Sequence, residues 1–157
     1  MDDIAPRREP SPDGAMPQAA ATHPGLGPAL VVEDEAVVAL AMADALTEAG
    51  ADDVSICHTT AAAMAEMQRL RPAILVLDVH LADRDDGWAL AELAVAMSPR
   101  PPLIVFSTGT PGSIPPHIAG MGHVLAKPFP PEALIRLVRS RLRPAGLIER
   151  LRSALTR

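Results

Sequence analysis

Residues 73–78 read AILVLD, an uninterrupted apolar run that ends in an aspartate. Such a run, rich in branched side chains, is typical of a strand that is covered on both faces within a parallel sheet. Pro72 precedes the run and ends any helix before it. We therefore predict a central, buried strand that stops at Asp78.

Strand and helix patterns alternate on both sides of this run. Apolar patterning predicts further strands at residues 30–32, 53–57, 103–106 and 123–126. Helical spacing predicts helices over residues 36–49, 60–70, 88–97 and 130–143. Residues 110–122 are rich in proline and glycine, so the fourth helix should be short or irregular. This alternation predicts an α/β fold, (βα)5, around a five-stranded parallel sheet.

The two ends of the chain differ in composition from the part between them. Residues 1–28 contain six of the seventeen prolines and are expected to form a disordered extension. Residues 29–143 form the predicted domain, and residues 144–157 form a short basic tail. We favour a solvated helix end for the basic residues there. The alternative is a docking face for an acidic partner or a nucleic acid.

The composition excludes several classes of protein. A chain of 157 residues with 48% hydrophobic residues has the material for one globular domain. No apolar run approaches the roughly 18–20 residues of a membrane span. The acidic, proline-interrupted start lacks the features of a secretory signal, so we expect a cytoplasmic protein without membrane contact. The single cysteine excludes an internal disulfide, and a net charge of −5 argues against direct DNA binding.

Polar side chains stand where the predicted strands end. Glu33 and Asp34 follow the first strand, Asp78 the third, Thr108 the fourth and Lys127 the fifth. The carboxyl ends of parallel strands share one edge of the sheet, so these groups should converge. Clustered carboxylates repel one another, and a hard cation such as Mg²⁺ relieves that conflict. A cation beside an ammonium group is typical of phosphoryl transfer, with Asp78 the best candidate for the nucleophile.

Four of these segments carry a family resemblance. VVEDE (residues 31–35), LVLDV (75–79), STG (107–109) and KPF (127–129) resemble the receiver domain of two-component response regulators. The resemblance covers residues 29–143 and implies a flavodoxin-like, doubly wound five-stranded parallel sheet, in agreement with the pattern above. We expect a stand-alone receiver that signals through protein contacts.

The resemblance also implies roles for individual residues. Asp78 would accept a phosphoryl group from a sensor histidine kinase or a histidine phosphotransfer protein. Asp34 would hold Mg²⁺ directly and Glu33 through water, with Asp78 and the backbone carbonyl of His80 as further ligands. The chain would be no enzyme beyond taking up this group and slowly hydrolysing it.

Two further residues complete the implied site. Thr108 would follow the phosphoryl group and report its presence. Lys127 would pair with Asp78 or with its phosphate, and the Lys127–Pro128 bond would be cis, as is usual in the family. The downstream partner is an unknown protein, and the sequence leaves open whether the chain forms a homodimer.

Three positions depart from the family pattern. Val124 stands where most members have Tyr or Phe, and no aromatic residue follows the Thr-Gly pair to replace it. The fourth helix is interrupted by proline and glycine. The loop after Asp78 has Ala82 in place of the usual proline and reaches Gly87 one residue late. The chemistry is intact, and the mode of signalling is open.

Other interpretations remain beside this one. A phosphorylation-independent interaction module would keep the acidic edge without using it. A small-molecule phosphatase with an aspartyl-phosphate intermediate is less well supported, because His80 stands where a second aspartate would act as general acid. Glu33 and Asp34 could merely favour a helix N-terminus. His80 could either border the site or be a plain exposed loop residue.

Overall fold

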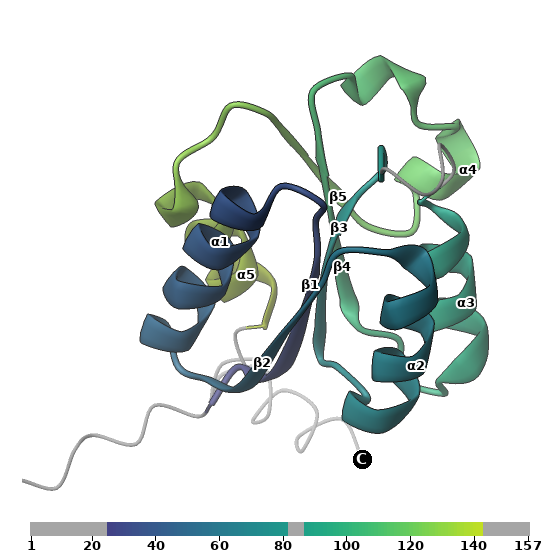
Figure 1. Ribbon diagram of the computed structural model, residues 1–157. Helices are drawn as coiled ribbons and strands as arrows, with labels where there is room; N and C mark the ends of the chain where they lie inside the picture. The colour runs from purple at the N-terminus through teal and green to yellow at the C-terminus, as the bar shows by residue number, and fades with distance from the viewer. Residues whose placement is uncertain (1–24, 82–86, 143–157) are drawn as a thin grey trace, which may run out of the picture.

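The computed structural model describes residues 25–81 and 87–142 and contains a five-stranded parallel sheet in the order β2-β1-β3-β4-β5 (Figure 1). The strands are β1 (Gly27–Val32), β2 (Ala51–Cys57), β3 (Ile74–Asp78), β4 (Leu103–Thr108) and β5 (His123–Ala126). The helices are α1 (Ala36–Glu48), α2 (Thr60–Leu70), α3 (Ala89–Met97), α4 (Pro116–Ala119) and α5 (Pro131–Leu142), with a 3₁₀ turn η1 (Pro111–Ser113). The predicted fold class is confirmed.

Helices cover both faces of the sheet. Helices α1 and α5 lie on one face, and α2, α3 and α4 lie on the other (Figure 1). In β3, Ile74 and Val76 pack under α1 and α5, while Leu75 and Leu77 pack under α2 and α3. Alternate residues of one strand thus enter two separate cores, which explains why the run has no polar position before Asp78.

Short local signals set the helix ends. Thr59 caps α2, because its hydroxyl accepts a hydrogen bond from Ala62 N at 3.2 Å. Helix α2 ends at Arg71, whose positive φ of 47° turns the chain into β3. Gly50, with a φ of 103°, makes the turn between α1 and β2.

Three strands extend further than predicted, and one of them is β2, which begins at Ala51 rather than at Asp53. β1 begins at Gly27 rather than Leu30, so Gly27 and Pro28 belong to the sheet and not to the predicted disordered extension. Pro28 has no N–H, but its carbonyl accepts a hydrogen bond from Ala73 N at 2.8 Å. β4 continues two residues past Phe106 and ends at Thr108, and this brings Ser107 into register with Asp78.

The fourth helix is short, as predicted. η1 contains three residues and α4 contains four, from Pro116 to Ala119. Residues 1–24, 82–86 and 143–157 lie outside the described part of the chain, and so do the predicted basic tail, most of the N-terminal extension and Ala82. Within the described ranges, no helix has the length and apolar character to cross a membrane.

Candidate functional site

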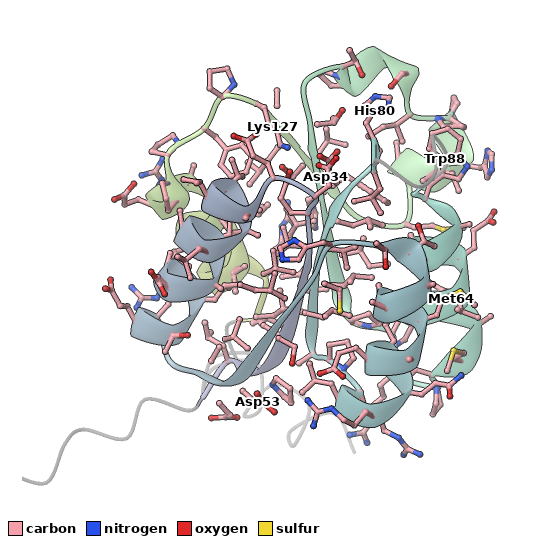
Figure 2. All side chains as sticks on the ribbon, in the orientation of Figure 1. Asp34, Asp53, Met64, His80, Trp88 and Lys127 are labelled. Carbon is pink, nitrogen blue, oxygen red and sulfur yellow. The ribbon has the colours of Figure 1, made fainter. Side chains whose placement is uncertain are left out.

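Four of the five strands, β1, β3, β4 and β5, bring polar residues at their carboxyl ends to one edge of the sheet. Asp78 is the last residue of β3, Glu33 directly follows β1, and Lys127 directly follows β5. The backbone ladder continues past the strands, because Glu33 N bonds to Cys57 O at 3.0 Å and Lys127 N to Thr108 O at 2.8 Å. The site therefore stands on rigid backbone. Figure 2 shows Asp34, His80 and Lys127 at this edge.

Lys127 joins two carboxylates. Its Nζ lies 2.8 Å from Glu33 Oε2 and 3.0 Å from Asp78 Oδ2. The Glu33 and Asp78 side chains are only 1% and 8% exposed, against 25% for Lys127, so both carboxylates meet their counter-charge with little water around them. The second oxygen of Asp78, Oδ1, accepts a hydrogen bond from His80 N at 2.9 Å. Both oxygens of Asp78 thus have a fixed partner.

The surroundings shift the pKa of two of these groups. Burial raises the pKa of Glu33, because it disfavours the charged carboxylate. The hydrogen bond from Lys127 lowers the pKa of Glu33, and the negative charge of Asp78 raises it further. Burial by itself would lower the pKa of Lys127, but the hydrogen bonds and charges of Glu33 and Asp78 outweigh it and raise that pKa. Two carboxylates, those of Glu33 and Asp78, share the single ammonium group of Lys127.

Three carboxylates fit a divalent cation here. Glu33, Asp34 and Asp78 each offer an oxygen, and these oxygens lie within 4.8 Å of one another. Asp34 is exposed and the other two are buried, so an ion could keep water on its open side. An all-oxygen donor set of this size suits Mg²⁺.

Thr108 lies at the same edge but is turned to a different partner. It is completely buried, and its Oγ1 accepts a hydrogen bond from Thr110 N at 3.0 Å. Lys127 N donates to the Thr108 carbonyl, but within residues 25–81 and 87–142 no hydrogen bond joins the Thr108 hydroxyl to Glu33, Asp78 or Lys127. The structure thus brings the carboxylates and Lys127 into contact and leaves Thr108 beside them.

A hydrogen-bonded bridge beside the site was not anticipated from the sequence. His80 Nε2 lies 2.7 Å from Thr110 Oγ1, which in turn lies 3.1 Å from Ser113 Oγ. Ser113 Oγ also donates to Thr110 O at 2.7 Å. The bridge joins the loop after β3 to the loop after β4. His80, for which two roles were open, is exposed and also borders the site.

Two other residues fix the backbone around the carboxylates. His58 Nδ1 lies 2.8 Å from the carbonyl oxygen of Glu33, a contact between positions 25 apart that spacing in the sequence does not reveal. Gly87 packs against the end of β3, where a Cβ would stand 2.7 Å from Asp78 O. The Lys127–Pro128 peptide bond is cis, as the resemblance implies.

The comparisons with known proteins agree with this geometry. The sequence profile of the response regulator receiver domain matches residues 29–139. A protein-glutamate methylesterase/protein-glutamine glutaminase of Anaeromyxobacter dehalogenans is 36% identical over 84 residues, and one of Archaeoglobus fulgidus is 30% identical over the same length. Each match covers 54% of this chain and 24% of the relative, so the chain spans about a quarter of these proteins.

Solved structures show the same fold. A CheY-like receiver domain from Methylobacillus flagellatus superposes with a TM-score of 0.65 at 21% identity, over 74% of this chain and 98% of that one. At 21% identity the structural similarity shows the fold alone, whereas the profile match over residues 29–139 shows the family. The chain belongs to the response regulator receiver domain family of two-component signal transduction systems.

Proposed function

We propose that Asp78 accepts the phosphoryl group in this receiver domain, from a sensor histidine kinase or a histidine phosphotransfer protein. Receiver domains in general receive their signal from such proteins. The observation that carries the proposal is the contact of Lys127 Nζ with both Glu33 Oε2 and Asp78 Oδ2, at 2.8 and 3.0 Å. A carboxylate beside an ammonium group, with two further carboxylates placed to hold a cation, is an arrangement for binding a phosphoryl group.

The transfer uses the fixed position of Asp78. One of its carboxylate oxygens forms a bond to phosphorus while the bond from phosphorus to the donor's imidazole nitrogen breaks, and the electron pair stays on that nitrogen. The hydrogen bond from His80 N to Oδ1 holds the carboxylate in place. Lys127 Nζ now donates to Asp78 Oδ2 at 3.0 Å. It would donate to an oxygen of the incoming phosphoryl group instead.

Glu33, Asp34 and Asp78 would hold Mg²⁺, with the His80 carbonyl as a further ligand. When bound, the ion would supply positive charge that offsets the carboxylates and the phosphoryl oxygens. Asp34 suits the direct contact because it is exposed. Glu33 is buried and already bonded to Lys127, which suits a contact through water.

The signal would pass through the end of β4 and Thr108 into the loop that follows. Thr108 shares the face of Phe106, under α2 and α3, whereas Asp78 shares the face of Val76, under α1 and α5. Thr108 would therefore act through Thr110 N, the present partner of its hydroxyl, rather than by direct contact with Asp78. Thr110 is tied to His80 and Ser113, so its movement would disturb that bridge and η1. This route needs no aromatic residue at Val124, and it ends at a surface where a downstream protein could bind.

Labelling with acetyl phosphate tests the proposal. Wild-type protein should take up phosphate in a Mg²⁺-dependent way, and Asp78→Asn should take up none, because an amide cannot form the acyl phosphate. Asp44→Asn is the matched control, since Asp44 is an exposed residue of α1. Undiminished labelling of Asp78→Asn would overturn the assignment. Beyond this uptake and slow self-hydrolysis we propose no catalytic activity for the domain.

A further inference from the structure

One side of α1 is apolar and yet open to solvent. The helix begins with seven consecutive apolar residues, AVVALAM (36–42), and contains no basic residue. Val37 and Leu40 are 77% and 55% exposed, more than any other large apolar side chain in the described residues. A helix that is apolar all round is typical of a buried position, so the open side of α1 calls for a partner.

Acidic side chains continue this apolar side of α1. Four exposed residues follow one another at spacings of three and four and therefore share one side of the helix, which we call the outer face of α1: Val37, Leu40, Ala41 and Asp44. The exposed Glu48 lies one turn further along. The outer face therefore fits a partner that combines an apolar stripe with basic groups.

A segment of this chain has that chemistry. Residues 143–157 lie outside the described part of the chain, and their sequence, RPAGLIERLRSALTR, contains four arginines and one glutamate. Large apolar residues stand there at helical spacing, at positions 147, 148, 151 and 155. In a helix, Arg150 and Arg152 would flank this stripe on either side. The sequence thus predicts a basic amphipathic helix.

We propose that residues 147–155 dock as an amphipathic helix on the outer face of α1. Their leucines would cover Val37 and Leu40, and Arg150 would lie within reach of Asp44. The sequence alone favours a solvated helix end for these basic residues, but the open apolar side of α1 argues for a contact instead. The inference is independent of the proposed function of Asp78, since the outer face contains none of the groups of the candidate site.

The chain leaves α5 at a suitable place for this contact. Helices α1 and α5 lie side by side, and both run from the carboxyl edge of the sheet to the opposite edge (Figure 1). Leu142, the last residue of α5, therefore lies at the end of the domain where α1 also ends. Residues 143–146 can span about 13 Å, more than the roughly 8–10 Å between the axes of packed helices. A helix over residues 147–155 is about 13 Å long, enough to cover the roughly 10 Å from Asp44 to Val37.

Two neighbouring grooves fit the segment less well. The groove between α1 and α5 is lined by four charged residues whose charges cancel: Glu48, Glu132, Arg136 and Arg139. The groove between α2 and α3 is lined by Arg71 and Arg100, which would repel the arginines of the segment. The outer face of α1 has open apolar surface and acidic charge without a basic residue.

Disulfide trapping in the full chain tests the contact. Every variant carries Cys57→Ala, because Cys57 is the one natural cysteine, and oxidised glutathione is the oxidant. Leu40→Cys combined with Leu151→Cys should form a disulfide within one chain, about 10-fold faster than Ser140→Cys combined with Leu151→Cys. Ser140 is exposed on α5 and nearer to the segment in sequence, so it reports the rate that a freely moving segment gives.

Charge reversal tests the role of the acidic groups. In the chain with Leu40→Cys and Leu151→Cys, Asp44→Arg should slow the linkage, because it places like charges together. Arg150→Asp added to the same chain should restore the rate. An unchanged rate in Asp44→Arg would contradict the proposal.

Two other results would overturn the docking. Linkage at position 40 that is no faster than at position 140 means that the segment does not rest on α1. Linkage between two chains, at a rate that rises with protein concentration, means that a second copy covers the outer face. Labelling of Asp78 with acetyl phosphate is a separate measurement, so the proposed function stands or falls without this result.

Discussion

Replacement of Lys127 by methionine removes the positive charge that joins Glu33 to Asp78. Methionine keeps the length and most of the apolar stem, so the loss is mainly electrostatic. Removal of one partner from a buried ion pair costs about 3–5 kcal/mol, since the remaining charge is left uncompensated. The Lys127 side chain is 25% exposed and partly screened by water. We therefore expect Lys127→Met to lower the free energy of unfolding by about 2–4 kcal/mol.

Urea unfolding at pH 7, with and without Mg²⁺, measures this loss. Mg²⁺ should stabilise Lys127→Met more than wild type, because no ammonium group then competes for Glu33 and Asp78. Arg136→Met, which removes an exposed charge from α5, should change stability by less than about 0.5 kcal/mol. The reasoning is refuted if Lys127→Met is as stable as wild type without Mg²⁺, or if Mg²⁺ stabilises both proteins equally.

Three further outcomes are expected. The raised pKa of Glu33 means that this carboxyl group keeps its proton to higher pH in the folded state than in the unfolded state. The free energy of unfolding should therefore fall as pH rises above 4.5, and in urea unfolding Glu33→Gln should remove this fall. Hydrogen bonds from Arg69 and Ser55 lower the pKa of Glu66 to about 2, so stability should rise with pH between about 2 and 4.5, and Glu66→Gln should flatten that rise. His80→Ala should break the bridge to Thr110 and speed amide hydrogen exchange in η1, and unchanged exchange there would count against the bridge.

The central strand and the site edge could be predicted because each rests on a strong local signal. A continuous apolar run forms a strand buried on both faces, and the polar residue after each run marks the common edge. Asp78 and Lys127 were placed in this way, although they are 49 positions apart, and the structure brings them to 3.0 Å.

The features that were missed depend on the ends of strands or on contacts between loops. The apolar pattern places the start of β1 too late, because Pro28 lacks an N–H and the sequence does not show that its carbonyl pairs with Ala73 N. The apolar run of β4 ends at Phe106, so the pattern does not predict that Ser107 pairs with Asp78. The bond between His80 and Thr110 joins two loops 30 positions apart, and no periodic pattern reports such a contact.

The location of the acyl phosphate tests the central claim most directly. Wild-type protein labelled with acetyl phosphate and Mg²⁺ is reduced with borohydride, which converts a phosphorylated aspartate to homoserine, and the modified peptide is identified by mass spectrometry. We predict homoserine at position 78 alone. Modification at Asp34 or another acidic residue instead, with residue 78 unchanged, would contradict the account.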